Sequence, residues 1–226
     1  MSRAIVAASL TLGLLAGVPA SGFASGIELR GGGFAPRAQS NLFTDDSALY
    51  NIDKKDWVGR TGGIEFSMKL VTNLELGFSV DGYGQTLDTH YREYTREDNT
   101  EILQTLKLSV VPVGVSLRLV PTSRHARLAP YAAVGGDLIF YRYEEFGDFI
   151  DFQSPDFDIV SDSFISEGTA PGFHVAGGLR VHIGPVFAFT GEVRYQWAKA
   201  DMQDDFRDFE IDLSGPSVTL GMLFRF

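Results

Sequence analysis

The sequence predicts an all-β fold, an eight-stranded antiparallel up-and-down transmembrane β-barrel, on the basis of three observations. Apolar and polar residues alternate along eight segments, as they do in strands whose two faces meet different surroundings. The connections between these segments are alternately long and short. The last segment ends on Phe226, with Phe224, Met222, Leu220 and Val218 on the same face. An even number of strands also places both ends of the chain on one side of the membrane.

Length and composition limit the function classes. The chain has 226 residues, a formal net charge of -10 and no cysteine. This length fits a single barrel domain. The missing cysteine excludes disulfides, thiol nucleophiles and thiolate metal sites. The acidic balance, without runs of Lys or Arg, argues against a nucleic-acid partner.

Residues 1–24 have the features of a signal peptide. Arg3 precedes an apolar run over residues 4–17, and small residues follow it. We expect cleavage after Ala24, with Ala20 as the second candidate. The run is shorter than the roughly 18 apolar residues that a spanning helix needs. We therefore expect residues 25–226 to be exported and to form a barrel domain that is integral to the cell outer membrane.

The eight strands and their connections follow from the alternation. The predicted strands are residues 27–34, 57–70, 74–87, 101–119, 128–143, 172–183, 187–197 and 212–226. Long polar loops are predicted at residues 35–56, 88–100, 144–169 and 199–209. Tight connections are predicted at residues 71–73, 121–127 and 184–185. Short turns on one side and long loops on the other are typical of outer-membrane barrels.

The fourth strand shows a change of phase. Leu106, Leu108 and Val110 share one face, whereas the later apolar residues, from Val113 onward, fall on the other. One additional residue would produce this shift, so we predict a β-bulge near Pro112, where a missing backbone donor is tolerated.

Large aromatic residues lie near the ends of strands that lead to long loops. They are Trp57, Tyr83, Tyr143, Tyr195 and Trp197. This position predicts an aromatic girdle at the membrane interface. The alternative is that aromatic residues simply favour strands.

Charged residues gather on the faces predicted to point inward. The predicted interior polar network consists of Glu65, Lys69, Glu75, Asp81, Arg118, Asp137, His174, Arg180, Glu192 and Arg194. The same faces carry Glu28, Arg30, Lys107, His182 and Arg225. Side chains nearly fill the lumen of an eight-stranded barrel, and charges that are removed from water need partners. We predict a lumen plugged by an ion-pair network, with a narrow polar pore as the alternative.

The final Phe226 and the Gly-containing strand segments at residues 134–136 and 175–178 resemble the OmpA/OmpX-type outer-membrane barrels. The resemblance implies an integral outer-membrane protein with a structural or surface-interaction role. Its implied partners are outer-membrane lipid, lipopolysaccharide and the barrel-assembly machinery, which reads Phe226 and Phe224. The alternative is a narrow porin-like channel for small solutes or ions.

A second alternative is a barrel enzyme that modifies lipid A. Lipid A deacylases use a His and a Ser two residues apart on one strand face, so that the nucleophile is activated. Here the residue two positions after His174 is Ala176, and the residue two positions after His182 is Gly184. No matching serine pattern accompanies His90. We therefore predict no enzymatic activity, no catalytic residues, no cofactor and no metal centre in the barrel.

The predicted third and fourth loops are acidic. Residues 144–169 combine many Asp and Glu residues with five Phe residues and contain no Lys or Arg. The fourth loop carries Asp201, Asp204, Asp205 and Asp208. The bland interpretation is a solvated surface. The alternatives are adhesion through the Phe residues, or binding of divalent cations by carboxylates, although the spacing matches no EF-hand loop.

Overall fold

The computed structural model describes residues 25–122, 126–151, 154 and 158–226. The predicted signal peptide and its cleavage sites lie outside the described residues, as do Phe152, Asp156 and Phe157 of the predicted third loop. No helix in the described part of the chain combines the length and the apolar character that crossing a bilayer requires.

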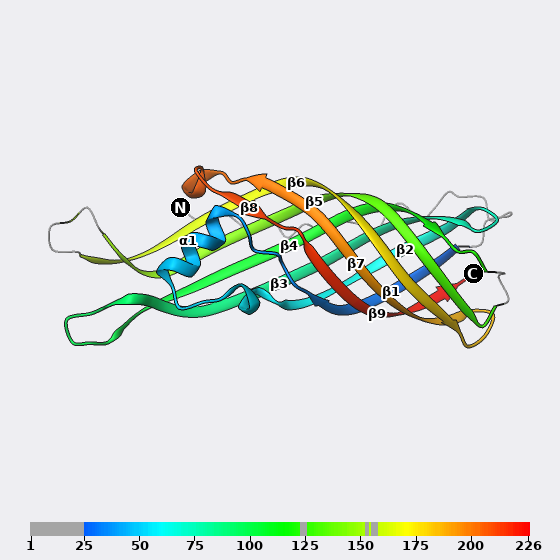
Figure 1. The fold of residues 1–226 in the computed structure, drawn as a ribbon, viewed down its shortest axis with the longest axis horizontal. Coiled ribbons are helices and arrows are strands. Elements are labelled where there is room, and N and C mark those ends of the chain that lie inside the picture. Colours follow the sequence, from blue (N-terminus) through cyan, green and yellow to red (C-terminus); the bar gives the residue numbers. More distant parts are fainter. Residues whose placement is uncertain (1–24, 123–125, 152–153, 155–157) are drawn as a thin grey trace, which may run out of the picture.

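Eight strands close into a ring, which confirms the predicted fold class (Figure 1). They are β1 (Ser25–Phe34), β2 (Gly59–Val71), β3 (Leu74–Thr95), β4 (Glu101–Leu119), β5 (Leu128–Ile150), β6 (Ile159–His182), β7 (Phe187–Asp201) and β9 (Gly215–Arg225). Neighbouring strands are antiparallel, and the β6–β7 pairing closes the ring. The backbone donors and acceptors therefore pair within the wall, as a lipid environment demands.

Small elements gather at one end of the barrel. The predicted first loop contains helix α1 (Asn41–Leu49) and the short helix η1 (Lys54–Trp57). Between β7 and β9 lie η2 (Asp204–Phe206) and β8 (Glu210–Asp212). Figure 1 shows α1 and β8 at the left, whereas the short connections and the C-terminus lie at the right. We call the right-hand side the turn end.

The predicted third loop is mostly strand, so that prediction was wrong. β5 and β6 pair without interruption from Leu128↔Val181 to Ile150↔Ile159. β3 likewise continues to Thr95, beyond the predicted end at residue 87. The acidic residues were interpreted as loop residues because polar residues on both faces hide the alternation. In a hairpin that projects into water, both faces of a strand can carry polar side chains.

β4 contains no bulge, so the predicted bulge near Pro112 was also wrong. Its register with β3 runs on from Tyr83↔Val110 to Val80↔Val113, and Pro112 pairs with Ile139 of β5. Buried and exposed residues alternate along the whole strand. The apolar residues change face because the surroundings change along the strand, whereas the strand itself stays in phase.

This reversal divides the barrel into two parts, which we call the band and the extension. In the band, the outer face is apolar, from Val111 to Leu119 on β4 and from Leu128 to Phe140 on β5. These segments of nine and thirteen residues are long enough to cross the apolar core of a bilayer, which takes about 9–11 tilted residues. In the extension, the outer face is mostly polar, and apolar residues fill most of the interior. The extension of β5, residues 141–150, adds roughly 30 Å along the strand.

Three of the five residues predicted for the aromatic girdle do not face outward. Trp57, Tyr83 and Tyr143 are buried, and Trp57 is only 1% exposed. They belong to the interior core of the extension. Tyr195 and Trp197 are half-buried on the outward-facing phase of β7, where Trp197 stacks on Phe173 at 4.7 Å between ring centroids.

Candidate functional site

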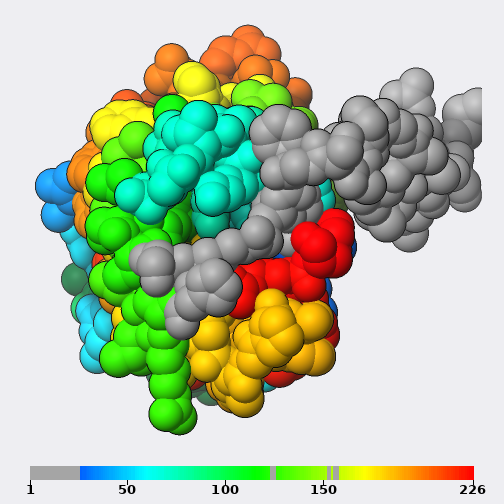
Figure 2. All heavy atoms as spheres, turned by 90° about the vertical axis from the view of Figure 1, so that its right-hand side faces the viewer, coloured from blue at the N-terminus to red at the C-terminus, as the bar shows by residue number. Residues whose placement is uncertain are grey.

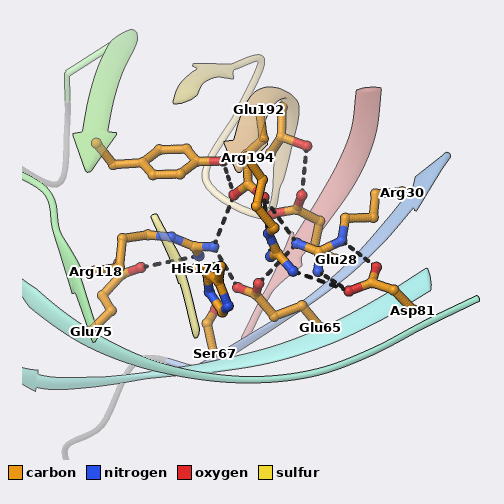
Figure 3. Close-up of polar contacts among 12 residues, drawn as sticks. Glu28, Arg30, Glu65, Ser67, Glu75, Asp81, Arg118, His174, Glu192 and Arg194 are labelled. Atoms are coloured by element: carbon orange, nitrogen blue, oxygen red, sulfur yellow. Dashed lines mark hydrogen bonds and ion pairs between the residues drawn. The ribbon is translucent and has the colours of Figure 1, made fainter. Parts of the chain in front are cut away.

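The interior of the band holds a network of ion pairs centred on Arg30 (Figure 3). Arg30 projects inward from β1, and its Nη1 atom lies 3.1 Å from Glu65 Oε2 on β2. Its Nε and Nη2 atoms donate to the two carboxylate oxygens of Asp81 on β3, at 2.8 and 2.5 Å. The guanidinium group of Arg30 thus links three consecutive strands.

Arg118 of β4 forms the second centre of the network. Its Nη2 atom lies 2.7 Å from Glu65 Oε1 and 3.6 Å from Glu192 Oε2 of β7. The Tyr131 ring lies 4.5 Å from the Arg118 guanidinium carbon, and the Tyr131 hydroxyl donates to Glu192 Oε2 at 3.0 Å. Figure 3 shows Arg118 and Arg194 approaching Glu192 from different sides. Because Arg118 and Glu65 side chains are each 1% exposed, their charges depend on one another rather than on water.

Arg194 and Arg180 complete the network. Arg194 lies 3.1 Å from Glu192 Oε1 and 3.3 Å from Asp81 Oδ2. Arg180 of β6 donates to Glu75 Oε2 of β3 at 2.8 Å. The predicted site residues Glu65, Asp81, Arg118, Glu192 and Arg194, together with Arg30, therefore lie in one cluster, from which Glu75 leads on to Arg180.

His174 and Asp137 form a separate pair. The Nδ1 atom of His174 lies 2.6 Å from Asp137 Oδ2, and both side chains are at most 2% exposed. Gly135 makes room for the imidazole, because a methyl group at Gly135 would meet His174 Cε1 at 2.5 Å. A carboxylate can orient an imidazole for catalysis, but this imidazole is enclosed by the barrel wall.

Two lysines differ from the network prediction in different ways. Lys107 lies on the outward-facing phase of β4, with its ammonium 4.5 Å from the Phe146 ring centroid, so its predicted inward orientation was wrong. Lys69 is half-buried near the turn end, and no ion pair to it occurs among the described residues.

Sequence reasoning did not assign Tyr131 and Thr190 to the network. Thr190 donates to Glu28 Oε1 at 2.9 Å. Tyr131 lies between Arg118 and Arg180, whose guanidinium carbons are 4.5 and 5.2 Å from its ring centroid. The available signal was their strand phase, since each shares an inward face with charged residues that were included.

The interior of the extension holds an aromatic plug formed by residues from several elements. Phe43 of α1 packs edge-on against Trp57 of η1 at 5.4 Å between centroids. Tyr143 of β5 lies 6.2 Å from Trp57 and 5.2 Å from Phe206 of η2. Leu106 and other inward residues of β4 extend this core. The segments predicted as the first and fourth loops therefore fold into the barrel mouth.

A pair of buried carboxyl groups lies within the plug. The Tyr143 hydroxyl is 2.8 Å from Asp46 Oδ2 of α1 and 2.8 Å from Glu145 Oε1. No ion pair to either carboxyl occurs in the described ranges. Burial raises the pKa of Asp46 well above its ordinary value, and the neighbouring Glu145 carboxylate raises that pKa further. Burial also raises the pKa of Glu145.

Cavities are small where the two parts of the barrel meet. A cavity of about 30 Å³, lined by Arg30, Asp81, Tyr83, Val110 and others, separates the ion-pair network from the plug. This volume is enough to hold a water molecule. A larger cavity of about 270 Å³ lies at the turn end. Nowhere in the described part of the chain do three or more His, Asp or Glu side chains gather as a metal site requires.

Comparisons with known proteins give matches among solved structures alone. No family model matches the sequence, and no curated protein does so. The outer membrane protein OprG from Pseudomonas aeruginosa aligns over 89% of this chain and 96% of its own, with 12% identity and a TM-score of 0.55. A major outer membrane protein from Thermus thermophilus covers 91% and 100%, with 10% identity and a TM-score of 0.51.

Neisserial surface protein A aligns over 90% of this chain and 96% of its own, with 12% identity and a TM-score of 0.50. Identities this low show the fold alone. The resemblance noted in the sequence is confirmed at that level: this chain has the fold of the small eight-stranded outer-membrane β-barrels.

Proposed function

We propose that this chain is an integral outer-membrane protein with a closed lumen, and that its extension acts at the cell surface in a structural or surface-interaction role. The apolar band supports residence in a membrane, because it surrounds a polar interior with exposed Val, Leu and Phe side chains. The fold shared with OprG and Neisserial surface protein A supports the outer membrane.

The observation that carries the closed lumen is that two different groups of side chains fill the barrel one after the other along its axis. They are the ion-pair network in the band and the aromatic plug in the extension. A solute would first have to part Arg30 from Asp81 and Glu65, whose side chains are largely buried. It would then have to cross the plug, where Trp57 and Leu106 are at most 1% exposed. Moving a charge through an apolar core without partners is costly. A porin-like channel would therefore require both the ion-pair network and the aromatic plug to move.

The barrel geometry also supports the expectation that the chain is not an enzyme. His174 is 1% exposed and lies inside the wall, away from the surface that lipid A would contact. Its partner two residues along the strand is Ala176, which offers no nucleophile. Unchanged lipid A mass spectra after overexpression would agree with this proposal, and a new acylation state would contradict it.

Conductance in planar bilayers tests the closed lumen. The refolded protein should show the shift of its gel band on heating that marks a folded barrel, and it should give no discrete current steps. Steps in preparations with a heat-shifted band would mean that the lumen conducts, and the closed-lumen proposal would fail.

Epitope labelling tests the orientation. A tag inserted at Ser154, in the β5–β6 connection, should be labelled on intact cells. The same tag inserted after Asn73, in the β2–β3 turn, should be labelled only in permeabilised cells. The reverse pattern would contradict the proposal that the extension faces the exterior.

A shortened hairpin tests the role of the extension. Phe146 and Ser163 are paired across β5 and β6, so a two-residue Asn-Gly turn can replace residues 147–162. We expect the heat-shifted band to remain, and either cell adhesion or resistance of the envelope to detergent to fall. Loss of adhesion would identify surface interaction, and loss of resistance would identify a structural role. Retention of both would contradict the proposal for the extension.

A further inference from the structure

A cavity of about 270 Å³, which we call the vestibule, lies at the turn end of the barrel. Its wall includes Lys69, Glu75, Arg180, His182 and Arg225. Figure 2 views this end, with the β2–β3 turn in cyan, the β6–β7 turn in orange and β9 in red. The vestibule is thus at the opposite end of the barrel from the plug.

The charge of the vestibule is opposite to that of the whole protein. Lys69, Arg180 and Arg225 are basic residues, and Glu75 is the one acidic residue among the described residues that line the cavity. Glu75 is compensated within the network, because Arg180 lies 2.8 Å and Arg118 4.0 Å from its Oε2 atom. The formal net charge of the chain is -10. A cation-rich cavity in such a chain concentrates anions locally.

Arg180 supplies the feature that distinguishes a binding site from a merely basic surface. Its side chain lines the vestibule and is 4% exposed, whereas Lys69 is half-buried. One guanidinium nitrogen, Nη1, donates to Glu75. The Nε and Nη2 atoms have no hydrogen-bond acceptor within the described ranges. Buried donors without acceptors are costly, and a bound oxyanion would provide acceptors for them.

Neutral donors line the same cavity. The hydroxyl of Thr122 is buried and has no partner among the residues that the structure describes. Asn73 contributes an amide at the rim. One face of the Arg180 guanidinium is occupied by the Tyr131 ring, at 5.2 Å. The Tyr131 ring therefore closes one face of the Arg180 guanidinium to a ligand.

We propose that the vestibule is a binding site for a phosphate-class oxyanion, held by Arg180 and Lys69. A tetrahedral oxyanion accepts several hydrogen bonds at once, which suits a guanidinium and an ammonium that converge on one cavity. The volume lies just below that of typical ligand pockets, so the site takes a small anion or a single headgroup. With the orientation proposed above, the vestibule opens to the periplasm.

Calorimetric titration of the refolded full chain with inorganic phosphate, at constant ionic strength set with chloride, tests this site. We expect one phosphate per chain. Lys69→Gln should weaken phosphate binding roughly tenfold, as expected for the loss of one charge-assisted hydrogen bond. Glu75→Gln should tighten binding, because it removes the negative charge nearest the anion.

Lys54→Gln is the matched control, because it removes the same charge from η1 at the far end of the barrel. It should leave phosphate binding unchanged. Each variant must show the heat-shifted band, so that a folding defect is not mistaken for lost binding. Absence of phosphate binding in the native chain, or equal weakening by the two lysine variants, would overturn the site.

Glycerol 3-phosphate distinguishes the two sources of this chemistry. Binding as tight as that of inorganic phosphate would assign the site to a phosphate monoester, such as a lipid headgroup. Binding of inorganic phosphate alone would assign it to the free ion. Either result supports an oxyanion site, and neither depends on the outcome of the conductance experiment.

Discussion

Arg30 and Asp81 form a two-point ion pair that passes over a whole strand, because Arg30 belongs to β1 and Asp81 to β3, with β2 between them. The planar guanidinium matches the carboxylate geometry, and a lysine in its place would offer one charge without the fork. The pair therefore adds a side-chain tie across three strands to the backbone ladder of the wall.

This pair should be far more important for stability than an ion pair at the surface. We predict that Arg30→Met lowers the free energy of unfolding by about 3–5 kcal/mol, because it leaves buried carboxylates without their partner. The matched control is Lys199→Met, which breaks the exposed Lys199–Glu210 pair and should cost less than about 1 kcal/mol. Urea unfolding in lipid vesicles measures both, and equal losses would refute the prediction.

The Asp46–Glu145 pair predicts that α1 packs better in acid. The Tyr143 hydroxyl has a single hydrogen, so it can bond to both carboxyl groups only if one of them is protonated. Both pKa values are raised from ordinary values of 3.8 and 4.5. Raised pKa values mean that this contribution to stability is fully present below about pH 4 and is lost as the pH rises through the folded-state values.

Fluorescence of Trp57 can report this change, because Trp57 contacts both Phe43 of α1 and Tyr143. In a Trp197→Phe background, we expect the emission of Trp57 to shift to the red as the pH rises above about 4, with urea present at a level that loosens α1. Asp46→Asn should remove this pH dependence. A shift of the same size in the Asn variant would show that other groups are responsible.

The boundary between band and extension can be tested with two apolar residues on one face of β4. Val115 is 46% exposed in the band, and Leu103 is 59% exposed in the extension. We predict that Val115→Arg destabilises the barrel by about 2–4 kcal/mol, the cost of a cation near the middle of a bilayer. Leu103→Arg should be nearly neutral, because water already surrounds it. Equal effects on unfolding in vesicles would place both residues in the same medium.

Substitutions of Phe226 and Phe224 should distinguish an effect on assembly in the membrane from an effect on the stability of the folded barrel. Phe226 is 68% exposed, whereas the Phe224 ring packs on Phe187 at 4.7 Å between centroids. We predict that Phe226→Ala lowers the yield in the outer membrane while the stability of the purified barrel stays within about 0.5 kcal/mol. Phe224→Ala should lower both. Normal yield of the Phe226 variant would show that this residue is not the assembly signal.

The alternation in the sequence was enough to predict the ring of strands and the inward phase of most charged residues. Glu192 and Arg194 on β7, for example, follow from the apolar set that begins at Phe187. The exact partners could not be predicted, because the Arg30–Asp81 pair depends on strand stagger and on side-chain length. Tyr131 was not assigned to the polar network because that prediction was based on charged side chains, and the tyrosine side chain is neutral.

The larger errors share one cause. A single rule, apolar outside and polar inside, was applied along every strand, although it holds only in the band. Where β4 leaves the band, Leu108 turns inward for the reason that leucines do in water-soluble proteins. The same oversight moved Lys107 to the wrong face and hid α1 and the outer half of the β5–β6 hairpin among predicted loops.

Because β5 and β6 pair in an unbroken register, the hairpin that they form can be shortened or lengthened without disturbing the rest of its pairing. Removing two consecutive residues from each strand of the hairpin, at adjacent paired positions such as Phe146↔Ser163 and Gly147↔Asp162, would shorten it by roughly 7 Å and keep every remaining side chain on its own face. Removing an odd number from one strand would exchange the two faces above the cut. Evolution or an engineer can therefore vary the reach of this hairpin in steps of two residues while the membrane-embedded half remains untouched.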